Sequence, residues 1–168
     1  MINKIKTHVN QLAKDLVVLC REKGMKISFA ESMTGGLLVS QITRIENASK
    51  ILEESFVVYS NQAKMRILSC KEETIKKHSV YSKEVVSEMI QGLNHFSQAH
   101  IKVSVSGIAG PKTYGDFKVG QVFIGIEINN ELFTFKQHFN GDREEIQWKT
   151  TEFIFEYILS QLEGRESL

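Results

Sequence analysis

The sequence predicts an α/β protein: a three-layer α/β/α sandwich with a mixed sheet and a late antiparallel hairpin. Helical and strand patterns alternate over the first two thirds of the chain, an order typical of parallel strands joined by helices. Two consecutive strand patterns around a polar turn then add an antiparallel pair. With 168 residues, of which 42% are hydrophobic, the chain can bury one core, and we expect a single domain over residues 1–168.

The first half alternates amphipathic helices with short apolar strands. Apolar residues recur every three or four positions from Ile2 to Leu19, which predicts a helix that ends at Gly24. The elements expected after it are a strand over residues 26–30, a polar loop over 31–36 with a helix through 43, a strand over 55–60 and a helix over 61–68.

Local capping signals delimit the helices of the second half. Ser69 and Glu72 have the spacing of a capping box, Ser82 resembles an N-cap, and Asp142 with Glu145 forms a further capping box. The expected elements are a short helix after 69, a helix from 82 to about 99, a strand over 101–106, two strands over 119–128 and 132–139 around an Asn129-Asn130 turn, and a last helix from 142 to about 162.

The charge balance and the cysteines exclude several classes of protein. With 21 basic and 20 acidic residues, the net charge of +1 supplies no general attraction to nucleic acid, so we expect no nucleic-acid partner. Cys20 and Cys70 lie far apart, and the five histidines show no paired spacing, so the pattern supports no metal site. We expect two buried free thiols.

The sequence also lacks targeting and membrane signals. Residues 1–6 show no apolar run of a secretion signal, and no stretch approaches the roughly 20 apolar residues of a membrane span. We therefore expect a cytoplasmic protein in a reducing compartment, without a membrane partner.

Polar or glycine-rich segments follow the predicted strands, where open α/β sheets bind ligands. These segments are residues 31–36, 59–64, 106–111 and 141–143. The first, Glu31-Ser32-Met33-Thr34-Gly35-Gly36, joins a strand to a helix, whose N-terminus suits a phosphate or an oxyanion. It matches neither a Walker P-loop nor a Gly-x-Ser-x-Gly elbow. A helix cap with packing glycines is the alternative interpretation.

The other three segments allow the same two interpretations. Lys64 lies near the positive end of a helix, which lowers its pKa, and a lysine of lowered pKa can deprotonate a serine; alternatively it is a solvated surface residue. For the segment from Ser106 to Pro111, the alternative to a role in ligand binding is a simple reversal of the chain direction. Arg143 can hold a phosphate with two hydrogen bonds, or can simply lie on the surface.

Four motifs in order resemble the CinA C-terminal domain family of competence-damage-inducible proteins. Residues 30–38, Ala-Glu-Ser-Met-Thr-Gly-Gly-Leu-Leu, are similar to the family signature Ala-Glu-Ser-Cys-Thr-Gly-Gly-Leu-Leu. The other three are residues 58–68, 106–111 and 141–143. The resemblance covers nearly the whole chain and implies an α/β/α fold, self-association into a homo-oligomer, and the stand-alone form without the N-terminal domain of larger members.

The resemblance also implies an activity. Characterised family members are nicotinamide-nucleotide amidases, which hydrolyse nicotinamide mononucleotide to nicotinate mononucleotide and ammonia in pyridine-nucleotide salvage, without a metal or an organic cofactor. It implies Ser32 as the nucleophile, Lys64 as its general base and Tyr59 beside them. Substrate contacts are expected from Glu31, Thr34, Gly35, Gly36, Ser106, Gly107 and Arg143, with Ser106 replacing the usual threonine.

The sequence departs from the family after Pro111. Family members usually continue with a run of glycines, whereas this chain reads Lys-Thr-Tyr-Gly-Asp-Phe-Lys over residues 112–118. Lys112 or Lys118 could supply charge to a phosphate there. Two alternatives to the amidase follow: a catalytically impaired protein that binds a pyridine nucleotide or a partner without turnover, and an amidase for another small amide. Self-association is further indicated by Phe133 and Phe135 on an expected edge strand.

Overall fold

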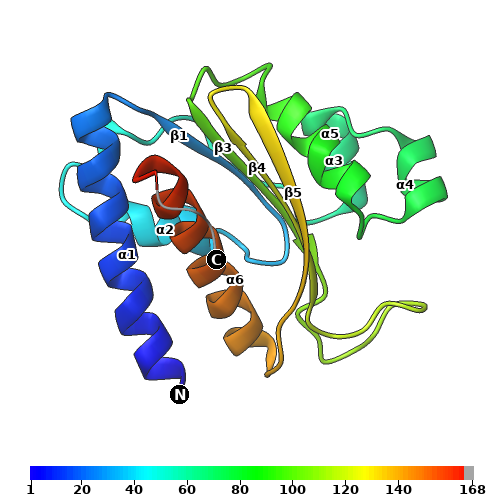
Figure 1. The fold of residues 1–168 in the computed structure, drawn as a ribbon. Coiled ribbons are helices and arrows are strands. Elements are labelled where there is room, and N and C mark those ends of the chain that lie inside the picture. The colour runs from blue at the N-terminus through cyan, green and yellow to red at the C-terminus, as the bar shows by residue number, and fades with distance from the viewer. Residues whose placement is uncertain (165–168) are drawn as a thin grey trace.

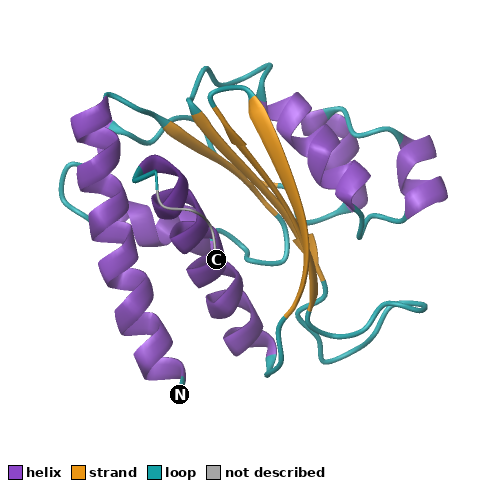
Figure 2. Ribbon diagram, in the orientation of Figure 1, coloured by secondary structure: helices purple, strands orange, loops and turns teal. Residues whose placement is uncertain are grey.

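A five-stranded mixed sheet lies between two layers of helices in the computed structural model, which describes residues 1–164 (Figures 1 and 2). Residues 165–168 of the expected domain lie outside the described residues. The strands are β1 (Ile27–Glu31), β2 (Phe56–Val57), β3 (Ile101–Gly107), β4 (Gln121–Ile128) and β5 (Glu131–His138), in the spatial order β2-β1-β3-β4-β5. The predicted α/β class with a mixed sheet and a late hairpin is confirmed.

Helices lie on both faces of the sheet (Figure 1). One layer consists of α1 (Ile2–Lys23), α2 (Leu37–Thr43) and α6 (Arg143–Leu162), and the other of α3 (Asn61–Leu68), α4 (Glu72–His78) and α5 (Lys83–Leu93); a short 3₁₀ turn, η1, covers Ala48–Lys50. The buried apolar side chains form two clusters, one on each side of the sheet. This arrangement is the predicted three-layer sandwich.

Several short-range signals operate as predicted. Gly24 ends α1 in the left-handed region at φ 65°, and the φ values of Asn129 and Asn130 are 50° and 69°, as a tight hairpin turn requires. Asp142 accepts a hydrogen bond from the Glu145 backbone N–H, and the Glu145 side chain accepts one from the Asp142 backbone.

The expected strand over 55–60 is shorter than predicted. Only Phe56 and Val57 pair with β1, because the chain leaves the sheet at Val58, whose carbonyl oxygen accepts a hydrogen bond from the Lys64 Nζ instead. The predicted helix from Ser82 also ends early, at Leu93, where the backbone tightens into i→i−3 hydrogen bonds.

The predicted capping box at Ser69 and Glu72 is wrong. Ser69 has φ 57° and ends α3, so it cannot adopt the extended conformation of an N-cap. The neighbouring helix α5 supplies the missing acceptor: Glu88 accepts hydrogen bonds from the Lys71 backbone N–H and the Thr74 hydroxyl. A tertiary contact therefore replaces the local cap.

Strands β1, β2 and β3 are parallel, so their carboxyl ends meet at one edge of the sheet. Strand β1 has β2 on one side and β3 on the other, and the segments after these strands leave the sheet side by side. Such a switch in strand order opens a crevice where α/β proteins bind ligands. Residues 32–36, 58–64 and 108–114 are therefore brought to the same edge.

Outside that edge, two further predictions can be compared with the structure. Cys20 and Cys70 are both free and buried, as expected. Phe133 and Phe135 lie on the edge strand β5, but their rings pack against Tyr157 of α6, with centroid distances of 5.7 and 4.7 Å. They are covered within the chain, which removes them as an argument for self-association. Among the helices of residues 1–164, none is both long and apolar enough to cross a membrane.

Candidate active site

A pocket of about 430 Å³ opens at the carboxyl edge of the sheet. Its walls come from the loop after β1, the start of α3, the α4–α5 connection, the segment after β3 and the start of α6. The lining residues are Ser32, Met33, Tyr59, Asn61, Lys64, Val80, Tyr81, Gly107, Ile108, Ala109, Gly110, Pro111, Lys112, Thr113, Tyr114 and Arg143. All four polar segments singled out in the sequence contribute to it.

Ser32 and Lys64 form a hydrogen-bonded pair in the floor of the pocket. The Lys64 Nζ lies 2.9 Å from the Ser32 Oγ and 2.9 Å from the Val58 carbonyl oxygen. Lys64 is 1% exposed and Ser32 is 7% exposed. A neutral amine can donate one N–H to Val58 and direct its lone pair at the Ser32 hydroxyl, which is the arrangement of a general base beside a nucleophile.

The electrostatics of the site favour the neutral lysine. Burial lowers the pKa of Lys64 to about 8, against an opposing contribution from the nearby Cys70 thiol. The cause is loss of hydration, because a buried ammonium exchanges water for few polar partners. At neutral pH a useful fraction of Lys64 is therefore uncharged.

Glu31 holds the loop that carries Ser32 and lies outside the pocket lining. Its carboxylate is 1% exposed and accepts hydrogen bonds from the backbone N–H groups of Gly36, Leu38 and Val39 at 2.9 to 3.2 Å. Burial raises the pKa of the Glu31 carboxyl, while these donors lower it. Glu31 thus caps α2 and sets the path of the loop, and its expected substrate contact stays a prediction.

Thr34, Gly35 and Gly36 are not among the residues that line the pocket, and their expected substrate contacts stay a prediction. Thr34 is a buried residue of the loop. Gly35 and Gly36 have φ values of 63° and 95°, so they allow the tight left-handed turn into α2. The motif therefore shapes the loop, whereas Ser32 and Met33 line the pocket.

The residue after Ser32 is held from the opposite end of the chain. The Gln147 side chain on α6 donates a hydrogen bond of 2.8 Å to the Met33 carbonyl oxygen. Within residues 1–164, the backbone N–H groups of Met33 and Ala109 have no acceptor, and both residues line the pocket. Both N–H groups are therefore available to a ligand in the pocket.

The other predicted site residues fall into two groups. Tyr59, Gly107 and Arg143 line the pocket, and an Arg143 Nη2 donates a hydrogen bond to the Gly110 carbonyl. Tyr59 is 61% exposed, and its hydroxyl is hydrogen-bonded to neither Ser32 nor Lys64 in the described chain. Ser106 is buried outside the lining, where its hydroxyl donates to the Val80 carbonyl oxygen at 2.9 Å.

Sequence reasoning missed two aromatic residues of the pocket and the glutamine that holds Met33. Tyr81 and Tyr114 line the pocket, although they are 33 positions apart in the sequence and belong to none of the four segments. Gln147 lies in the middle of a helix, where no local pattern distinguishes it. The departure of residues 112–118 from the family pattern was the one signal for Tyr114.

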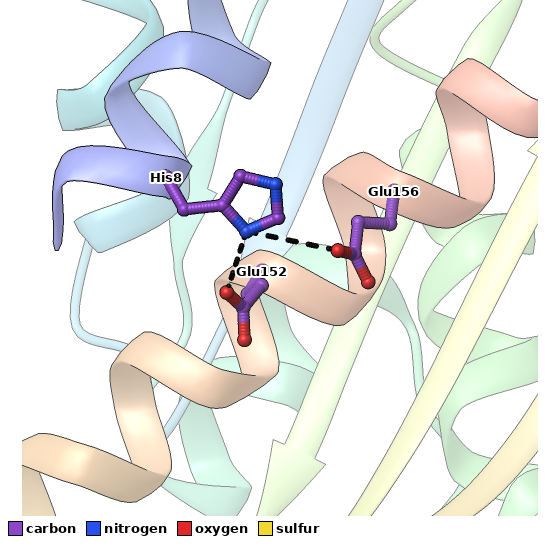
Figure 3. A group of neighbouring side chains, drawn as sticks. All are labelled: His8, Glu152 and Glu156. Carbon is purple, nitrogen blue, oxygen red and sulfur yellow. Dashed lines mark hydrogen bonds and ion pairs between the residues drawn. The ribbon is translucent and has the colours of Figure 1, made fainter. Parts of the chain in front are cut away.

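A separate polar cluster joins α1 to α6, away from the pocket. The Nδ1 of His8 lies 2.8 Å from a Glu152 oxygen and 3.7 Å from a Glu156 oxygen (Figure 3). Among the described residues, one potential metal-ligand atom from each of these three side chains lies within 4.8 Å of the other two. The spacing of the residues in the sequence does not reveal this grouping. His8 and Glu156 are about half exposed, and the cluster acts as a surface contact between two helices.

Comparison with known proteins identifies the family of this chain. Residues 9–162 match the family CinA C-terminal domain. A CinA-like protein of Petrotoga mobilis is 45% identical over 140 residues, which cover 83% of this chain and 35% of that protein. A CinA-like protein of Thermotoga maritima is 40% identical over 152 residues, or 90% of this chain and 37% of that protein. The chain thus spans about a third of the length of these curated relatives.

Solved structures are similar over almost their whole length. The crystal structure of a competence or damage-inducible protein from Enterobacter asburiae has a TM-score of 0.89 and 32% identity, covering 92% of this chain and 98% of that one. A competence/damage inducible protein from Agrobacterium tumefaciens has a TM-score of 0.87 and 28% identity, covering 93% and 96%.

Proposed function

The chain belongs to the CinA C-terminal domain family, and on that premise we propose that it is an amidase that hydrolyses nicotinamide mononucleotide to nicotinate mononucleotide and ammonia. The observation that carries the proposal is the buried Ser32–Lys64 pair, with its 2.9 Å hydrogen bond, in the floor of a pocket. A serine beside a lysine of lowered pKa is a nucleophile with its own base.

The first half of the reaction forms an acyl-enzyme. Neutral Lys64 takes the proton of Ser32 while the Oγ attacks the carboxamide carbon of the substrate. The carbonyl oxygen becomes an oxyanion, which the N–H groups of Met33 and Ala109 can stabilise. When the intermediate collapses, the C–N bond breaks, and the Lys64 ammonium protonates the departing nitrogen so that it leaves as ammonia.

The second half returns the enzyme to its starting state. Water enters the space vacated by ammonia, Lys64 accepts one of its protons, and the hydroxide attacks the ester carbonyl. The Ser32 Oγ then leaves and regains its proton from Lys64. The net reaction consumes one water and produces one carboxylic acid and one ammonia, and it needs no additional reactant.

Two cations at the pocket wall support a phosphorylated substrate. Arg143 and Lys112 both line the pocket, and no Asp or Glu does so within the described residues. Their side chains give the opening a positive potential that suits the phosphate of a nucleotide. Lys118, the other candidate from the sequence, is not among the lining residues.

Ammonia release from nicotinamide mononucleotide by the purified protein tests the proposal. Replacing Ser32 with Ala removes the nucleophile, and we expect turnover to fall by at least about 10³-fold while the circular dichroism spectrum and melting temperature are retained. Ser40→Ala is the matched control, because Ser40 lies on α2 outside the pocket. Undiminished turnover in Ser32→Ala would refute the mechanism.

The assay also separates the alternatives. Release of ammonia from another small amide, but not from the mononucleotide, would identify a different substrate for the same pair. Binding of the mononucleotide without any turnover would indicate the catalytically impaired protein. Of these, the hydrogen-bonded Ser32–Lys64 geometry favours an active amidase.

A further inference from the structure

Three tyrosines from different segments border the pocket: Tyr59 after β2, Tyr81 before α5 and Tyr114 in the loop after β3. The rings of Tyr81 and Tyr114 meet edge to face, with centroids 5.6 Å apart. Burial, and then the nearby phenols of Tyr114 and Tyr59, raise the pKa of Tyr81. The three side chains therefore gather around one opening.

Tyr114 differs from the other two because it is both held and exposed. The 112–118 loop is pinned by backbone hydrogen bonds in both directions between Tyr114 and Phe117, at 3.4 and 3.0 Å. Phe117 in turn packs against Tyr81 at 5.4 Å and Phe123 of β4 at 6.4 Å. Even so, Tyr114 is 62% exposed.

The remaining rings are less suited to contact a ligand. Tyr81 is half-buried, with Tyr114 on one side and Phe117 on the other. Tyr59 is exposed, but in the described chain no ring contact holds it. A planar side chain that is fixed in place and open to the pocket is the usual platform on which a flat aromatic group stacks.

We infer that Tyr114 is a specificity-determining residue of this pocket: its ring stacks on the aromatic ring that carries the carboxamide, so the pocket selects aromatic heterocyclic amides over aliphatic ones. The inference rests on the proposed function and deepens it by naming the substrate class. Each part of the substrate then has its own contacts. Ser32 and Lys64 contact the amide, and Arg143 and Lys112 contact the phosphate. Tyr114 stacks on the aromatic ring.

Binding to a catalytically inert protein tests this role apart from turnover. In a Ser32→Ala background, isothermal titration calorimetry would compare nicotinamide mononucleotide with ribose 5-phosphate, which has the same sugar phosphate but no ring. Tyr114→Leu removes the aromatic ring and keeps apolar volume, whereas Tyr114→Phe keeps the ring. Phe96→Leu is the matched control, because Phe96 is a 48% exposed aromatic residue outside the pocket lining.

Stacking predicts a selective effect. Tyr114→Leu should weaken mononucleotide binding about 10-fold, with ribose 5-phosphate unchanged, and Tyr114→Phe and Phe96→Leu should stay within about twofold of the parent. Equal losses for both ligands, no loss for the mononucleotide, or no binding by the parent would each overturn the inference.

Ammonia release by the protein with Ser32 intact separates this inference from the proposed function. Turnover that is unaffected by Tyr114→Leu would preserve the amidase and refute the stacking role. Ring-dependent binding without turnover would preserve the stacking role and refute the amidase.

Discussion

The side-chain nitrogen of Lys64 lies 2.9 Å from the hydroxyl oxygen of Ser32, although the two residues follow different strands of the sheet. Ser32 comes directly after β1, and Lys64 lies in α3 behind the short strand β2. Because β1 and β2 are parallel neighbours, both segments emerge at the same edge. The Val58 carbonyl, freed from the sheet, holds the amine in place.

Catalysis should increase with pH as Lys64 loses its proton. With a pKa of about 8, roughly a tenth of Lys64 is neutral at pH 7. We expect kcat/KM for the mononucleotide to rise about tenfold from pH 7 to a plateau above pH 9, following one ionisation. Initial rates of ammonia release between pH 6 and 9.5 would show this. A profile that is flat between pH 7 and 9 would contradict the role of Lys64 as the base.

The same ionisation links stability to pH. The Lys64 pKa falls from 10.5 in the unfolded chain to about 8 in the folded one, so the unfolded chain binds the extra proton between these values. Folding is therefore penalised by about 3 kcal/mol below pH 8, and the penalty disappears as pH rises toward 10.5.

Lys64→Met removes this ionisation and tests the link. Its free energy of unfolding, relative to the parent, should fall by about 2 kcal/mol between pH 7.5 and 10, because only the parent gains stability over that range. Urea unfolding of both proteins at the two pH values measures the difference and cancels the titration of other groups. A pH-independent difference would mean that folding does not shift this pKa.

Glu31 should be required for the shape of the loop. Glu31→Ala leaves the N–H groups of Gly36, Leu38 and Val39, at the start of α2, without their acceptor, and we expect a loss of about 3 kcal/mol in the free energy of unfolding, with a lower kcat. Glu31→Gln, which retains one carbonyl oxygen, should lose less. Urea unfolding and ammonia release report the two effects. Glu54→Ala, at an exposed position, is the control; an equal effect there would disprove the capping role.

Removing one partner of a buried ion pair between β3 and β4 should lower the free energy of unfolding. Lys102 and Glu127 lie 3.1 Å apart with side chains 7% and 11% exposed. Lys102→Met leaves the Glu127 carboxylate buried without its partner and should lower the free energy of unfolding by about 3 kcal/mol. Adding Glu127→Leu in a double variant should restore most of this loss. In the exposed pair of Lys76 and Glu72, Lys76→Met should change stability by less than about 0.5 kcal/mol. Denaturant unfolding compares the parent, the two single variants, the double variant and Lys76→Met; additive effects of the single changes Lys102→Met and Glu127→Leu would contradict the coupling.

Self-association stays a prediction that rests on the family resemblance. Strand β5 is an edge of the sheet, with its outer backbone groups free of a sixth strand in the described chain. We expect light scattering to give a mass at least twice the 19.2 kDa of one chain. A mass of one chain at micromolar concentration would contradict this.

Local signals in the sequence determined most of the secondary structure. Gly24, the Asn129-Asn130 turn and the Asp142 capping box act through bonds to near neighbours, so their effects can be read without knowing the fold. The pairing of Ser32 with Lys64 was expected from the family resemblance, because each segment by itself also allowed a purely structural interpretation. Ser69 misled because Glu88, distant in the sequence, provides the cap instead.

The tertiary structure decided which side chains face the pocket. Glu31 and Ser106 belong to the motifs, yet their polar groups turn inward to support the loops, whereas Tyr81 and Gln147 come from segments with no local signature. The reason is physical: a capping or turn signal depends on a few adjacent residues, but the direction of a side chain depends on what the sheet and the helices place next to it.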